Sequence, residues 1–89
     1  MRSTVYADEL ATGISGDARV ERLQVHGTGD VEIRFSWWKN GNLATRPLDV
    51  TEEHLLDLMR SGILAGVFTD TFMKQLEQML NKHLNGGSI

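Results

Sequence analysis

The fold is decided by residues 31–43, which read VEIRFSWWKNGNL. From the start of this stretch, apolar or aromatic side chains alternate with polar ones, and a period of two is typical of a β-strand. The pair Asn40-Gly41 favours a two-residue type I′ turn, because both central positions of that turn need a positive φ. The stretch therefore predicts a β-hairpin. Its return strand is expected over residues 43–48 and at a sheet edge, because Pro47 cannot donate a ladder hydrogen bond.

The two-residue turn also determines which side chains share a face. Trp38 is expected to face Leu43, and Trp37 to face Ala44, since directly paired residues lie on the same side of a sheet. The side with Trp37 carries the alternating apolar residues, so we expect it to be the core. The opposite side then presents Trp38, Leu43 and Arg34 on an open sheet face.

The residues before the hairpin are expected to complete the sheet. Residues 19–26 predict a strand, in which Val20 is out of phase with Leu23 unless a bulge near residues 21–22 shifts it. Residues 4–7 could form a short strand, or residues 8–11 could form a helical turn instead, and both interpretations stay open at this point.

Two helices are expected after the hairpin. Thr51 and either Thr69 or Asp70 are expected N-caps, because their side chains accept a hydrogen bond from a backbone N–H of the first turn. Gly62 is expected to end the first helix. Apolar residues recur at helical spacing in both segments. The residues expected to be mostly buried are Phe35, Trp37, Leu55, Met59, Phe72, Leu76 and Leu80.

Together these elements predict an α+β fold. An antiparallel sheet of three or four strands is expected to carry both C-terminal helices on one face, which is a common two-layer solution. The length of 89 residues fits a single domain. A domain of this size has a modest core, so we expect it to act through its outer surface.

The composition excludes several classes of function. The net charge is −3, and the nine lysines and arginines are scattered along the chain, so nucleic acid is not an expected partner. The absence of cysteine excludes disulfides and thiolate zinc sites. The first residues lack the apolar stretch of a signal peptide. We therefore expect a cytoplasmic protein without a membrane anchor.

The sequence contains no pattern that indicates catalysis. The histidines His26, His54 and His83 have no metal-ligand spacing. Glu52 and Glu53 are expected in the first turn of a helix, where the helix dipole favours acidic residues. No nucleophile elbow or phosphate-binding glycine loop is present. We expect no catalytic residue, metal or cofactor, and no enzymatic activity.

The most informative feature is the second tryptophan of the hairpin. If Trp37 lies in the core, Trp38 points away from the helices, and a large aromatic side chain on an open face is typical of a binding surface. The alternative is that the N-terminal segment folds over Trp38. The predicted partner-binding residues are Trp38, Leu43, Arg34, Lys39 and Arg46.

Residues 30–84 resemble the small phage-encoded anti-CRISPR proteins that block type I surveillance complexes. The resemblance rests on the alternating strand, the Asn-Gly hairpin, an arginine-bearing return strand, and the run Asp49-Val50-Thr51-Glu52-Glu53 that opens two short helices. It implies a non-catalytic protein that covers a surface of a larger host complex through its sheet face. No position-specific motif aligns, so no functional residue of the family is carried over.

Two other functions remain open from the sequence. The chain could be a homodimeric structural or accessory protein whose sheet face or edge forms its own interface. It could instead bind single-stranded nucleic acid, with Trp38 as a stacking platform and Arg34, Lys39 and Arg46 at the phosphates. The acidic balance of the chain counts against nucleic acid.

Overall fold

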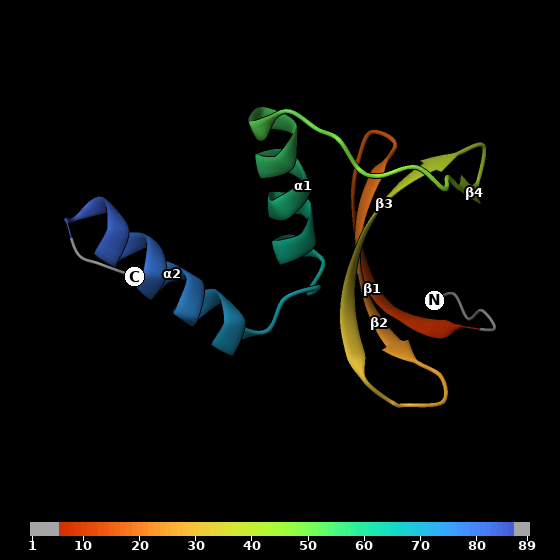
Figure 1. Cartoon of the computed structure of the whole chain (residues 1–89), viewed down its shortest axis with the longest axis horizontal. Coiled ribbons are helices and arrows are strands. Elements are labelled where there is room, and N and C mark those ends of the chain that lie inside the picture. Colours follow the sequence, from red (N-terminus) through yellow and green to blue (C-terminus); the bar gives the residue numbers. More distant parts are fainter. Residues whose placement is uncertain (1–5, 87–89) are drawn as a thin grey trace.

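The structure is a computed structural model that describes residues 6–86. Four strands form one antiparallel sheet in the order β1-β2-β3-β4, and two helices follow (Figure 1). The elements are β1 (Ala7–Ser15), β2 (Ala18–Val25), β3 (Val31–Lys39), β4 (Asn42–Leu43), α1 (Glu52–Leu64) and α2 (Asp70–Leu84). The expected α+β fold is confirmed.

The expected hairpin joins β3 to β4. Asn40 and Gly41 have φ angles of 52° and 78°, as a type I′ turn requires, and Trp38 pairs with Leu43. The expected return strand over residues 43–48 is wrong, because β4 ends at Leu43. Beyond it the chain leaves the ladder, and the carbonyl of Pro47 accepts a hydrogen bond of 2.9 Å from the Trp37 indole.

The sheet irregularity lies in β1 and not in β2. The β2–β3 pairing runs without a register shift, so the bulge expected near residues 21–22 is wrong. The shift occurs between Glu9 and Ala11 on β1. Val20 and Leu23 therefore point to opposite faces, and both are buried. The helical turn considered for residues 8–11 is also wrong, because they belong to β1; residues 1–5 lie outside the described residues.

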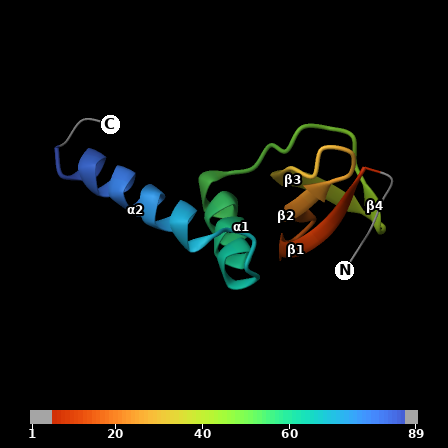
Figure 2. The same cartoon turned by 90° about the horizontal axis from the view of Figure 1, so that it is seen from below.

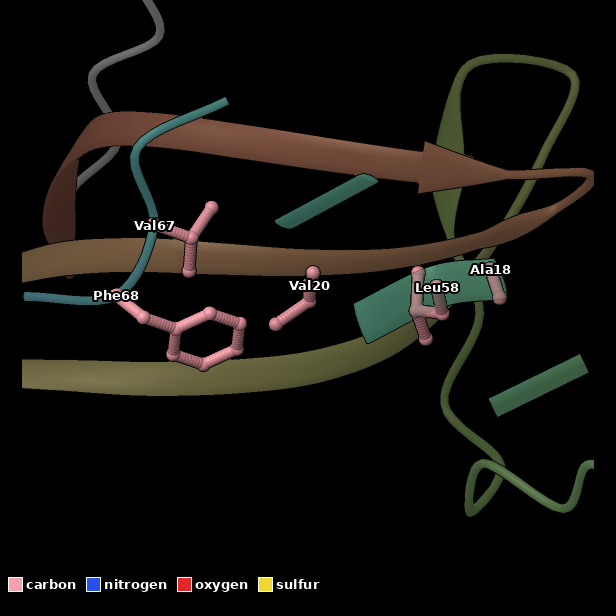
Figure 3. Close-up of a cluster of buried hydrophobic side chains, with 5 residues drawn as sticks. All are labelled: Ala18, Val20, Leu58, Val67 and Phe68. Carbon is pink, nitrogen blue, oxygen red and sulfur yellow. The ribbon is translucent and has the colours of Figure 1, made fainter. Parts of the chain in front are cut away.

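The core lies between α1 and the middle of the sheet. Leu58 of α1 meets Val20 of β2, and Val67 and Phe68, from the connection between α1 and α2, close the same cluster (Figure 3). The buried cluster consists of Ala18, Val20, Leu58, Val67 and Phe68. The connection between the helices thus supplies part of the core that α2 was expected to supply.

A contact between two glycines sets how closely α1 approaches β1. A Cβ atom on Gly13 would lie 2.4 Å from the backbone nitrogen of Gly62, so only glycine fits at this crossing. The expectation that Gly62 ends the first helix is therefore wrong. The helix continues to Leu64 with Ala65 as its C-cap, and Gly66 adopts a φ of 78°.

Only part of the sheet is covered by a helix. In the described chain, α1 packs on β1 and β2 and meets β3 at Trp37, whose ring centroid lies 6.0 Å from that of His54. The apolar side chains of β3 on the α1 side are therefore exposed (the β3 row: Val31, Ile33 and Phe35). The periodicity correctly indicated their common face, but the expected burial of Phe35 is wrong.

The second helix departs most from the expected packing. Within residues 6–86, α2 packs on none of the four strands, and Figures 1 and 2 show it extending away from the sheet. No residue of α2 is buried. Of the expected core, Phe35, Leu55, Phe72 and Leu80 are exposed, and Trp37, Met59 and Leu76 are half-buried.

Candidate functional site

The expected aromatic recognition surface on the outer sheet face does not exist in the folded chain. Trp38 is only 4% exposed. Its indole Nε1 donates to Ser36 Oγ at 2.8 Å, and the Arg19 guanidinium lies over the ring, 4.3 Å from its centroid. Arg19 is on the neighbouring strand β2, paired with Ser36, so a residue of the same sheet face covers Trp38.

A polar network continues from Trp38 across this face. Ser36 Oγ donates to Glu21 Oε1 at 3.2 Å, and Arg34 donates to the same oxygen from Nε at 3.0 Å and forms an ion pair from Nη2 at 2.9 Å. Glu21 is 1% exposed, so its charge needs these partners. Arg34 is therefore engaged inside the sheet.

The buried carboxyl of Glu21 has a perturbed acidity. Burial raises the pKa of Glu21 above its ordinary value, and the hydrogen bond with the Glu9 side chain raises it further. Arg34 and the Ser36 hydroxyl oppose these effects and lower the pKa in part. All four residues share one sheet face and hold neighbouring strands together, which is a structural role.

The structure brings some of the five predicted binding residues together and separates others. Trp38 and Leu43 are paired, and Leu43 is exposed, while Lys39 is exposed next to the turn. Arg46 lies elsewhere, because its guanidinium is 4.8 Å from the centroid of the Trp37 ring. The predicted exposure of Trp38 is wrong, and a role of these residues in binding stays a prediction.

The His26 and His54 side chains, which could in principle act in catalysis or bind a metal, make contacts with other parts of the fold. His54 Nε2 donates to the carbonyl of Ser15 at 3.0 Å, which ties the start of α1 to the end of β1. His26 Nε2 meets Asp8 Oδ1 at 3.0 Å on the surface. Within residues 6–86, no group of three or more histidine, cysteine, aspartate or glutamate residues is arranged to hold a metal ion.

An extended apolar surface lies on α2, where the sequence predicted core residues. Its apolar side chains form one continuous face of the helix at helical spacing. This α2 stripe consists of Phe72, Met73, Leu76, Met79, Leu80 and Leu84. Four of these side chains are exposed and two half-buried.

A groove runs between the end of α1 and the α2 stripe. It has a volume of about 370 Å³, and Ile63 of α1 forms one of its walls. The α2 side is lined by Met73, Leu76, Leu80 and Leu84, with Glu77 and Asn81 also in the lining. The groove is therefore lined mainly by apolar side chains, with polar side chains beside them, which is the composition of a protein-binding surface.

The sequence signal for this surface is the apolar pair Val67-Phe68 directly before α2. Val67 and Phe68 stand directly before Thr69, whose side chain accepts a hydrogen bond from the backbone N–H of Phe72 and begins α2. In the structure both side chains are buried and occupy part of the core that α2 was expected to fill. The α2 stripe is then left outside.

Comparisons with known proteins add no further constraint. No family model matches the chain, and no curated protein or solved structure matches it. Among the helices of the described residues, none is long and apolar enough to cross a membrane. The surfaces of this chain are therefore the features that indicate its function.

Proposed function

We propose that this protein is a non-catalytic protein-binding module and that the α2 stripe is its main contact surface. One observation carries the proposal: α2 has a complete N-cap and a continuous apolar face, and in the described chain only the base of that face, at Phe72 and Met73, contacts the core. Contiguous exposed apolar surfaces of this kind mark interaction sites in water-exposed proteins.

The geometry of α2 fits a known mode of protein recognition. Phe72, Leu76, Leu80 and Leu84 recur every four residues along the helix, so they project from one side as a row of anchors. Helices that bind in grooves use this spacing. Charged residues such as Lys74 lie on the remaining surface and leave the apolar row as the contact.

The burial of Trp38 and the pairing of Arg34 favour a protein partner over nucleic acid. A single-strand binder stacks bases on exposed aromatic rings beside free cationic groups, whereas here the ring is covered by Arg19 and Arg34 is bound to Glu21. The anti-CRISPR resemblance would make the partner a host surveillance complex. That partner stays a prediction, and α2 replaces the Trp38 face as its expected contact.

Affinity capture with matched variants tests the proposal. Leu80→Asp places a charge in the α2 stripe, and Gln78→Asp places the same charge on the polar side of the same helix. The tagged protein is incubated with a lysate of the source cells to which an untagged copy has been added, and captured proteins are identified by mass spectrometry. We expect wild type and Gln78→Asp to capture the same protein and Leu80→Asp to lose it. Equal capture by all three would contradict the proposal.

A further inference from the structure

The base of α2 is anchored, so the helix does not behave as a loose tail. Val67 is fully buried and Phe68 nearly so. Both backbone hydrogen-bonding groups of Val67 have partners. Its N–H donates to the Gly62 carbonyl at 2.9 Å, and its carbonyl accepts from Arg22 Nη1 at 3.1 Å. Phe72 stacks on Phe68 with ring centroids 5.3 Å apart. The core therefore fixes the direction in which α2 leaves the domain.

Because α2 leaves the domain in this direction, the β3 row and the α2 stripe of one chain do not pack on each other. The β3 row and the α2 stripe are both exposed, and within residues 6–86 α2 packs on no strand. The groove between Ile63 and the α2 stripe is likewise open. A helix with an apolar face is the element that such a groove accommodates, and each copy of this chain presents one.

The exposed area is the amount that a stable dimer would bury. The chain measures 45 × 29 × 21 Å with a radius of gyration of 14.7 Å, whereas a compact domain of this length has about 12 Å. Its accessible surface is 6443 Å², and a compact monomer of 10.0 kDa exposes about 5,200 Å². The excess of about 1,200 Å² exceeds the roughly 800 Å² that each partner contributes to a standard interface.

The small core favours a second copy of the chain as the partner. In the described residues, the buried hydrophobic side chains are fewer than the exposed large ones. Additional burial further stabilises a domain with so small a core, and oligomerisation is one of the usual ways to obtain it. A second copy is the one partner that is present whenever the chain is made.

Building on the proposed function, we propose that the partner is a second copy of this chain, and that α2 of each copy lies in the α1–α2 groove of the other. A two-fold axis relates the copies, so the α2 stripe of one packs on the α2 stripe and Ile63 of its partner, and the reverse. The interface is isologous, and it closes the assembly at two copies.

Sedimentation equilibrium with the full chain and the same variants tests the oligomeric state. We expect wild type and Gln78→Asp to be dimeric and Leu80→Asp to shift the dimer dissociation constant by at least about tenfold, as loss of an interface anchor does. Leu80 is 52% exposed in the single chain, so Leu80→Asp should keep the circular dichroism of wild type. Wild type that stays monomeric up to about 100 μM, where a micromolar dimer would be saturated, overturns the inference.

The arrangement of the copies is tested on wild type alone, independently of any substitution. Isotopically labelled and unlabelled chains are mixed, and nuclear Overhauser effects between the two kinds of chain are recorded. We expect contacts from the Ile63 methyl groups of one copy to Leu80 or Leu84 of the other. A dimer that lacks contacts to α2 overturns the proposed arrangement.

The outcomes separate this inference from the proposed function. Monomeric wild type that captures a different protein from the lysate through Leu80 overturns the second copy as partner and leaves the protein-binding function in place. Monomeric wild type that captures nothing overturns both. Dimeric wild type whose self-capture is lost in Leu80→Asp, and kept in Gln78→Asp, supports both.

Discussion

At the scale of single residues, the two adjacent tryptophans have exchanged the roles that alternation suggested for them. Trp38 is buried under Arg19 with its indole bonded to Ser36, whereas Trp37 is half-buried and bonds to the Pro47 carbonyl. We predict that Trp38→Ala lowers the free energy of unfolding by about 3–5 kcal/mol, the cost of truncating a buried tryptophan, and that Trp37→Ala costs less. Chemical denaturation of both variants measures the difference.

A conservative variant separates ring packing from the hydrogen bond. Trp38→Phe keeps an aromatic ring under Arg19 but removes the donor to Ser36, so its loss of stability should lie between those of wild type and Trp38→Ala. An exposed tryptophan would instead leave the stability almost unchanged on truncation. Trp38→Ala with wild-type stability would thus restore the open binding face.

Glu21 makes stability depend on pH with a definite sign. Because burial and the bond with Glu9 raise the pKa of Glu21 above its ordinary value of 4.5, the folded state binds this proton more tightly than the unfolded state. Its contribution to the free energy of unfolding is fully present below the unfolded pKa and is lost as the pH rises through the folded pKa. Arg34, on the paired strand, limits the loss.

We therefore predict that Glu21→Gln removes this part of the pH dependence. Glutamine keeps an acceptor for Ser36 and Arg34 but does not titrate, so the melting temperature of wild type relative to Glu21→Gln should fall as the pH rises from about 4.5 upward. Thermal denaturation of both proteins in matched buffers measures it. A difference that grows with pH would mean that the Arg34 ion pair dominates and that the pKa is lowered.

At the scale of elements, the Gly13–Gly62 crossing determines how α1 meets the sheet. We predict that Gly13→Ala destabilises the fold by about 3 kcal/mol or more, because the new Cβ meets backbone atoms that cannot rotate away. Ile14→Ala is the control, since Ile14 is exposed on the same strand and its truncation should cost far less. Equal melting temperatures for the two variants would show that α1 does not cross β1 at this glycine.

Local elements were predictable from the sequence because their determinants are local. The Asn40-Gly41 turn and the caps Thr51 and Thr69 depend on residues within one turn of the chain. The pairing of Trp38 with Leu43 follows from the turn alone. Such features hold whatever packs on the element afterwards.

The packing of elements was not predictable, because an amphipathic pattern shows which face of an element is apolar but not which part of the chain packs on that face. The alternation in β3 separates two faces, but it does not tell that α1 leaves Val31, Ile33 and Phe35 exposed and that Arg19 lies over Trp38 on the other side. The α2 stripe has the periodicity of a core helix. Val67 and Phe68 occupy the site on the sheet, and the periodicity of α2 contains no information on them.

At the scale of the whole molecule, a small buried cluster on one side of the sheet is combined with a long apolar surface on α2, the helix that extends away from the sheet (Figure 2). The first supplies enough packing to position α1, and the second is large enough for an interface. Folding and association are then linked, because burying the α2 stripe adds to the stability of a domain whose own core is modest.

This linkage makes thermal stability depend on protein concentration. If two copies bury their α2 stripes together and unfold to single chains, each tenfold increase in concentration adds about 1.4 kcal/mol to the stability of the dimer. We predict that the melting temperature of wild type rises steadily with concentration, that Gln78→Asp follows it, and that Leu80→Asp melts at one temperature throughout. Differential scanning calorimetry over a hundredfold concentration range makes the comparison, since that range changes the stability of the dimer by about 2.7 kcal/mol. A wild-type melting temperature that does not move with concentration would mean that the small core holds the fold alone, and that the α2 stripe is exposed for a different protein.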